Sequence, residues 1–206
     1  MRYVLAMVAA VGLLNIQGLS GAQGSQALTE VRRLYDAGRF GEAIAAAERV
    51  DTAQSSRFRF IAASSQEKLN NIDAARQSYR RLAEGNDPAW AAIGNTALAV
   101  LDKRLDAAMG SANEAVKRGD SLPEAHYERG LVLMLRRDYD EAAAEFEKAT
   151  SLDPSFAGAH YYAGLANYRA RHVDRMASHF ETFLKLAPNA PERPEVESIM
   201  RTLRGR

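Results

Sequence analysis

The chain has 206 residues, of which 47% are hydrophobic and 26% are charged, a composition typical of a folded protein rather than of a disordered one. It contains no cysteine, which excludes disulfides, thiolate metal sites and a cysteine nucleophile. Its 27 basic and 26 acidic side chains nearly balance, whereas a nucleic-acid-binding protein normally carries a clear positive excess to neutralise phosphates. We therefore predict no nucleic-acid partner.

Residues 1–22 have the pattern of a secretory signal. Arg2 is their only charged residue, an apolar or small stretch of 12 residues follows at 3–14, and small residues at 20–22 precede Gln23. We predict cleavage before Gln23 and a periplasmic or secreted protein with no stable membrane insertion after cleavage. The alternative is a retained membrane anchor. The apolar stretch is short for that role, because a membrane-spanning helix needs about 20 apolar residues.

Three stretches between residues 24 and 122 combine a turn signal with apolar or alanine residues at helical spacing. They begin at the equivalent positions Phe40, Ile72 and Leu105, and each predicts the second helix of a helix pair. Asp87-Pro88 predicts the start of a further helix, because Asp caps helix amino termini and Pro suits the first helical position. This part of the chain is therefore predicted to be entirely helical.

The segment 123–190 repeats with a period of 34 residues. The recurring pairs are Gly130 and Gly164, Phe146 and Phe180, Pro154 and Pro188, and His126-Tyr127 and His160-Tyr161. Within a unit, apolar residues at helical spacing predict two short helices, and the proline that closes the unit stops the second one. Neither helix can bury its apolar face alone, so the units must stack.

These residues resemble the tetratricopeptide repeat. Its glycine, turn aromatic, first alanine, second aromatic, second alanine and proline correspond to Gly130, Tyr139, Ala142, Phe146, Ala149 and Pro154. His126 and His160 depart from the pattern, since they stand where a tryptophan is usual. The resemblance implies an all-α fold of the exported bacterial type, a right-handed α-solenoid of about five helix pairs over 23–190. The predicted units are 24–55, 56–88, 89–122, 123–156 and 157–190, with equivalent turn residues at 40, 72, 105, 139 and 173.

Residues 191–206 are predicted to form a C-terminal capping helix and tail. Val196, Ile199, Met200 and Leu203 fall at i, i+3, i+4 and i+7, the spacing of one apolar helix face. A solenoid needs such a cap because its last unit otherwise exposes an apolar surface.

In tetratricopeptide repeats the second, fifth, ninth and twelfth residues of the units line a concave groove. Carried over to this chain, the resemblance implies a protein-binding groove of Trp90, Ile93, Tyr127, Leu131, Met134, Tyr161 and Leu165. The same positions of the second unit hold Arg57, Phe60, Ser64 and Glu67. Aromatic and methionine side chains favour recognition surfaces. The alternative is that these side chains pack against neighbouring helices, or that the chain's own cap partly fills the groove.

The sequence contains no zinc-peptidase helix, no glycine-rich phosphate loop and no serine nucleophile elbow. His126 and His160 occupy equivalent repeat positions and are predicted to be packing residues. His172 and His179 lie seven residues apart, roughly 10 Å along a helix, which is too far to share a metal ion. We therefore predict no catalytic residue, no metal site and no cofactor, and a protein that is not an enzyme.

The predicted function is that of a non-catalytic scaffold or adaptor of the cell envelope, which binds a protein or peptide partner in the concave groove. The alternative is a structural or self-associating component of an envelope, secretion or pilus assembly. The sequence does not identify the partner.

Overall fold

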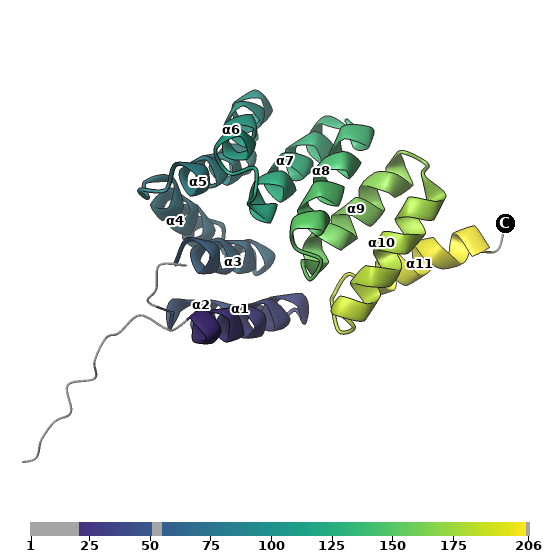
Figure 1. The fold of residues 1–206 in the computed structure, drawn as a ribbon, viewed down its shortest axis with the longest axis horizontal. Helices are drawn as coiled ribbons and strands as arrows, with labels where there is room; N and C mark the ends of the chain where they lie inside the picture. Colours follow the sequence, from purple (N-terminus) through teal and green to yellow (C-terminus); the bar gives the residue numbers. More distant parts are fainter. Residues whose placement is uncertain (1–20, 51–54, 205–206) are drawn as a thin grey trace, which may run out of the picture.

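The computed structural model describes residues 21–50 and 55–204, and this part of the chain consists of eleven α-helices without a strand (Figure 1). The helices are α1 (Gly21–Asp36), α2 (Phe40–Glu48), α3 (Ser55–Lys68), α4 (Ile72–Ala83), α5 (Pro88–Leu101), α6 (Leu105–Arg118), α7 (Pro123–Arg136), α8 (Tyr139–Leu152), α9 (Ala157–Arg169), α10 (Val173–Leu186) and α11 (Arg193–Arg204). The predicted all-α helical repeat fold is confirmed. Residues 1–20 of the predicted signal lie outside the described residues. Its last two positions, 21 and 22, are the first two residues of α1.

The helices form five consecutive pairs, which stack side by side in an arc (Figure 1). The second helices begin at the equivalent turn residues found in the sequence, namely Phe40, Ile72, Leu105, Tyr139 and Val173. The preceding turn contains a residue with left-handed backbone geometry in every pair: Gly38, Asn70, Lys103, Arg137 and Arg171. Only the first of these turns uses glycine, which adopts this geometry without steric cost.

Small residues let the two helices of a pair approach closely. The fourth residue of the first four second helices is a fully buried alanine: Ala43, Ala75, Ala108 and Ala142. In the last two pairs a glycine lies under an aromatic ring: a Cβ on Gly130 would meet the Phe146 ring at 2.7 Å, and one on Gly164 would clash with the Phe180 ring. The period of 34 thus reflects one packing arrangement used twice.

Asp87 and Pro88 start α5 as the sequence predicts. The Asp87 carboxylate accepts hydrogen bonds from the backbone N–H groups of Ala89, at 2.9 Å, and Trp90, at 3.3 Å. It thereby satisfies two of the donors that a helix amino terminus leaves free.

The last helix, α11, covers the end of the array. Val196 is fully buried and Met200 is 9% exposed, and both join a core that contains Phe180 and Phe183. The segment before α11 reaches the first two pairs: Glu192 forms a 2.7 Å ion pair with Lys68 at the end of α3. A Cβ on Gly38 would lie 2.8 Å from the Pro191 ring. The first pairs and the carboxyl-terminal segment therefore lie in contact.

Within residues 21–50 and 55–204, none of the helices has both the length and the apolar character required to cross a membrane.

Candidate protein-binding groove

The first helices of four pairs, α1, α3, α7 and α9, face one another around a shared hollow, which we call the central groove. Tyr35 of α1 and Tyr127 of α7 line each of three adjoining pockets in it. Tyr127 is the centre of an aromatic cluster, with its ring centroid 4.8 Å from that of Phe156 and 5.7 Å from that of Tyr162. Burial raises the pKa of Tyr127 well above its usual value, so its hydroxyl is neutral.

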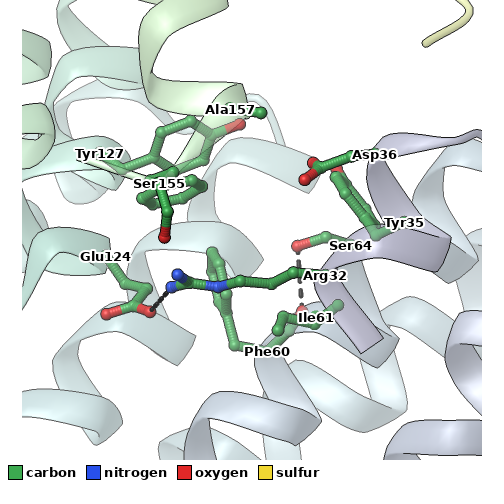
Figure 2. Close-up of a pocket in the computed structure, with 11 residues that line it drawn as sticks. Arg32, Tyr35, Asp36, Phe60, Ile61, Ser64, Glu124, Tyr127, Ser155 and Ala157 are labelled. Carbon is green, nitrogen blue, oxygen red and sulfur yellow. Dashed lines mark hydrogen bonds and ion pairs between the residues drawn. The ribbon is translucent and has the colours of Figure 1, made fainter. Parts of the chain in front are cut away.

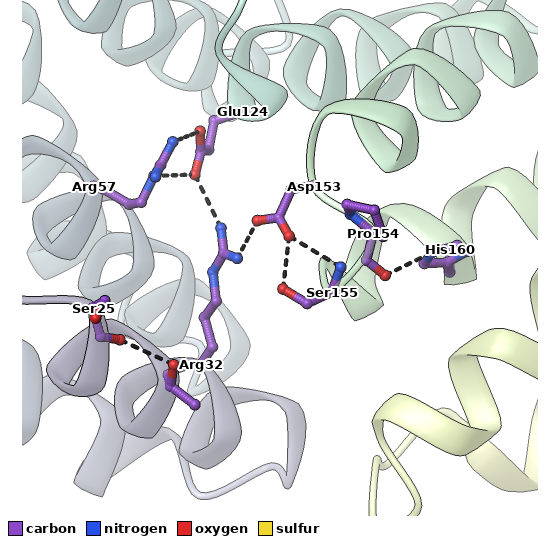
Figure 3. A network of polar contacts seen from close by, with 9 residues as sticks. Ser25, Arg32, Arg57, Glu124, Asp153, Pro154, Ser155 and His160 are labelled. Atoms are coloured by element: carbon purple, nitrogen blue, oxygen red, sulfur yellow. Dashed lines mark hydrogen bonds and ion pairs between the residues drawn. The ribbon is translucent and has the colours of Figure 1, made fainter. Parts of the chain in front are cut away.

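Arg32 reaches across one end of the central groove, from α1 to the amino-terminal end of α7 (Figure 2). Its Nη2 lies 3.3 Å from Oε1 of Glu124, and its Nη1 forms an ion pair with Asp153 between α8 and α9. Arg57 of α3 binds the same Glu124 carboxylate, with 2.9 Å between Nη2 and Oε2 (Figure 3). The Glu124 side chain is only 2% exposed, and a buried charge is tolerated when it is paired in this way.

This network occupies most of its pocket. The free volume beside Arg32 is about 30 Å³, enough for about one water molecule. Both guanidinium groups also lie over aromatic rings, with Arg32 5.3 Å from the centroid of Phe156 and Arg57 5.9 Å from that of Trp90. The chain therefore fills this end of the central groove with its own α1.

The structure places the seven predicted groove residues at different depths. Trp90, Ile93, Tyr127 and Tyr161 are buried, with at most 8% of their surface exposed. Leu131, Met134 and Leu165 are half-buried. The four buried side chains are therefore part of the packed interior, as the alternative interpretation of the sequence expects. The role of the seven residues in binding stays a prediction.

Tyr161 shows how the cap covers the groove. Its hydroxyl donates a 2.8 Å hydrogen bond to Glu195 of α11, and its ring centroid lies 5.3 Å from that of Phe183. The capping helix thus occupies part of the surface that the sequence assigns to a partner.

Arg32 and Tyr35 were missed by the sequence reasoning, although a signal for them exists. They are the ninth and twelfth residues of the unit that begins at 24, which are groove positions in the repeat pattern. The predicted groove residues come from the second to the fifth units, so the first unit contributes none to the prediction. Glu128 of α7 was also missed, because it is not at one of the four groove positions, yet it lines the pocket beside Tyr127.

His126 of α7 and His160 of α9 each contact the loop that precedes their own helix. His126 contacts the Asp120 carbonyl at 3.0 Å and Glu145 at 2.8 Å, and His160 contacts the Pro154 carbonyl at 3.2 Å. Burial opposes the charge of His126, but Glu145 and the carbonyl outweigh burial and raise its pKa. Among the described ranges, no group of three or more His, Asp or Glu side chains is placed to hold a metal ion.

Comparisons with known proteins agree with this architecture. Two family models, both described as tetratricopeptide repeat, match the chain, one at 123–156 and the other at 28–89 and 61–123. These matches together span 28–156, so this part of the chain consists of tetratricopeptide repeats. No curated protein matches it.

Several solved structures are similar in fold. TTC0263, a thermophilic tetratricopeptide-repeat protein from Thermus thermophilus, is 20% identical with a TM-score of 0.60, over 85% of this chain and 98% of that one. The first tetratricopeptide domain of Spaghetti (RPAP3), bound to an HSP90 peptide, is 18% identical with a TM-score of 0.55, over 58% and 95%. YrrB, described as having an unusual peptide-binding site, is 16% identical with a TM-score of 0.52, over 84% and 90%. At these identities the likeness shows the fold alone.

Proposed function

We propose that this protein is a non-catalytic scaffold that binds a segment of a partner protein in the central groove. Tetratricopeptide repeats commonly bind peptides in a scaffold role, and two proteins of similar fold are described with a bound peptide or a peptide-binding site. The observation that carries the proposal is the pocket between α1, α3, α4, α7 and α9, which has a volume of about 250 Å³. Leu131, one of the predicted groove residues, lines it together with Tyr127.

We further propose that the protein works in the cell envelope, in the periplasm or outside the cell. The support is the signal pattern of residues 1–22, with its single charge at Arg2 and its apolar stretch at 3–14. Sequencing the amino terminus of the protein recovered from its own cells tests this point. A terminus at Gln23 agrees with export and cleavage, and a terminus at Met1 contradicts it.

A peptide-display selection on the purified chain tests the scaffold function. We expect extended peptides to be enriched, and Leu131→Asn to weaken their binding because Leu131 lines the open pocket. The matched control is Leu135→Asn on the same helix, since Leu135 is 52% exposed and lines none of the three groove pockets. Equal binding by both variants would move the binding site to another face. If no peptide were enriched, the structural or self-associating role would be favoured, and light scattering would show that association directly.

A further inference from the structure

The open pocket of the central groove contains two carboxyl groups, Glu67 from α3 and Glu128 from α7. We call it the Glu128 pocket. Its other lining residues are Tyr35, Ser64, Lys68, Tyr79, Tyr127, Leu131 and Tyr162. Its volume of about 250 Å³ distinguishes it from the filled pocket beside Arg32, which has about 30 Å³.

The Glu128 carboxyl group has no hydrogen-bond or ion-pair partner among the described residues. The residue is only 4% exposed, and no hydrogen bond or ion pair from residues 21–50 or 55–204 reaches its carboxyl group. The acidic side chain that acts on its charge is Glu67, which disfavours ionisation of Glu128. A carboxyl group that lies on an open pocket and has no partner among these residues is free to contact a ligand, and a cation in the pocket would stabilise its charged form.

The other charged and polar groups of the pocket are already engaged. Glu67 accepts a 2.6 Å hydrogen bond from the Tyr79 hydroxyl, which also lies 3.2 Å from Ser64 Oγ. Lys68 directs its ammonium group to Glu192, at 2.7 Å, in the segment before α11. The only cation of the pocket lining is therefore paired elsewhere, and Glu128 is left to an incoming group.

The walls of the pocket suit an alkylammonium group. The rings of Tyr35, Tyr127 and Tyr162 line it, and aromatic rings attract cations and cover apolar stems. Lysine carries its compact charge on a flexible four-carbon stem, which lets the charge reach a carboxyl group that is itself buried. An acidic side chain would meet two acidic residues here, and Lys68, the cation of the lining, is already paired with Glu192.

We propose that the Glu128 pocket binds a lysine side chain of the partner segment, with the ammonium group between Glu67 and Glu128 and the stem against the tyrosine rings. This inference rests on the proposed function, since it specifies which side chain the groove recognises. It also predicts binding of an isolated lysine analogue, which is measurable without knowledge of the partner.

Titration calorimetry of the purified chain with N-acetyl-lysine amide tests the proposal. We expect binding of this probe and none of N-acetyl-norleucine amide, which has the same stem without the charge. Glu128→Gln and Glu67→Gln should each weaken binding about tenfold or more, because each removes a charge-assisted contact. The control Glu141→Gln changes an exposed acid of α8 and should leave binding unchanged. Absence of binding, or equal binding by all variants, would overturn the proposal.

The release of a proton from Glu128 on binding provides a second test. Burial, followed by the charge of Glu67, raises the pKa of Glu128 to about 8, so its carboxyl group is mostly protonated at pH 7. The other titratable groups facing it are Glu67, Lys68 and the hydroxyls of Tyr35, Tyr79, Tyr127 and Tyr162. A bound ammonium group should make Glu128 ionise, so the heat of binding at pH 7 should depend on the ionisation enthalpy of the buffer. A heat that is the same in all buffers would show that Glu128 releases no proton on binding, and together with a Glu128→Gln variant that binds the probe as tightly as the unaltered protein it would contradict the proposal.

The peptide selection separates this inference from the proposed function. Enriched peptides with a lysine at one fixed position support both. Enriched peptides without a basic residue, together with no binding of the lysine analogue, would overturn the inference and leave the scaffold function standing. Binding of the analogue without any enriched peptide would support the pocket and count against the scaffold function.

Discussion

Arg32 and Glu124 are 92 residues apart in sequence, yet their side chains meet at 3.3 Å across the central groove. The contact joins the first helix of the first pair to the first helix of the fourth. Asp153 holds the same guanidinium group from the loop before α9. The N-terminal helix α1 is thus a wall of the groove, so groove shape depends on these ion pairs as well as on the stacking of neighbouring pairs.

Replacement of Arg32 by alanine should loosen α1. Glu124 keeps Arg57 as a partner, so we expect a loss of about 1–3 kcal/mol in the free energy of unfolding rather than the larger loss for an isolated buried charge. Amide hydrogen exchange should quicken in α1 and hardly change in α7 to α10, because α1 is then held mainly by α2 and α3.

Arg33→Ala is the matched control for this prediction. Arg33 lies on the same helix, and its ion pair with Glu30 is exposed, at 57% and 52% of the two side chains. Exposed pairs contribute little, so exchange in α1 should stay close to that of the unaltered protein. Similar exchange in the Arg32 and Arg33 variants would show that the ion pairs across the groove do not hold α1.

The repeated helix pairs could be predicted because their causes are local. The turn residues recur in all five pairs and place the starts of α2, α4, α6, α8 and α10. An alanine follows three positions later in the first four of these helices, and a closing proline follows the last two. The contacts between Arg32, Glu124 and Asp153 could not be predicted in this way. They depend on small rotations that accumulate from pair to pair, which the repeat period does not encode.

How deeply the groove residues are buried also depends on contacts between elements that are distant in sequence. The repeat pattern indicates that Tyr127 and Tyr161 face the inner side of the array, and they do line groove pockets. It does not indicate that α1 and α11 pack against that side. Both tyrosines are 8% exposed, and the hydrogen bond from Tyr161 to Glu195 of α11 is one contact that the repeat pattern does not predict.

The close approach of α4 and α5 makes Gly94 intolerant of substitution. A Cβ at Gly94 would lie 2.7 Å from the backbone nitrogen of Ala83 and 2.7 Å from the carbonyl oxygen of Tyr79. Backbone atoms cannot move aside as a flexible side chain can, so Gly94→Ala should lower the free energy of unfolding by about 1–3 kcal/mol.

Gly110→Ala is the contrasting variant, measured by the same denaturant unfolding. Gly110 lies inside α6, and a Cβ there would meet nothing within 4 Å. Alanine is the better helix former, so this variant should gain about 0.5–1 kcal/mol. A Gly94 variant as stable as the unaltered protein would mean that α4 and α5 are farther apart than the structure shows.

Tyr161→Phe tests how α11 is held. The change removes the hydroxyl that donates to Glu195 and keeps the ring that packs on Phe183. We expect a loss of about 1 kcal/mol and faster hydrogen exchange confined to α11 and the segment before it. Tyr168→Phe is the control, since Tyr168 is 38% exposed and should give no change in either measurement. Equal exchange rates in α11 of the two variants would show that the hydrogen bond between Tyr161 and Glu195 does not hold α11 in place.

Glu128 should make the stability of the protein depend on pH. Burial and then Glu67 raise its pKa from 4.5 to about 8 in the folded protein, so the folded state binds this proton more tightly than the unfolded chain does. Stability from this group is fully present below pH 4.5, falls as the pH rises and is lost above about pH 8. Glu128→Gln removes the ionisation and therefore this pH dependence.

Denaturant unfolding of both proteins at pH 5 and pH 9 measures the effect. We expect the free energy of unfolding of Glu128→Gln to exceed that of the unaltered protein by several kcal/mol more at pH 9 than at pH 5. Comparison at each pH cancels the titration of groups outside the pocket, and Glu141→Gln, which changes an exposed acid, should show no such difference. A difference that is equal at both pH values would mean that Glu128 is ionised in the free protein. The Glu128 pocket would then already hold a charge, and binding of a lysine side chain would proceed without release of a proton.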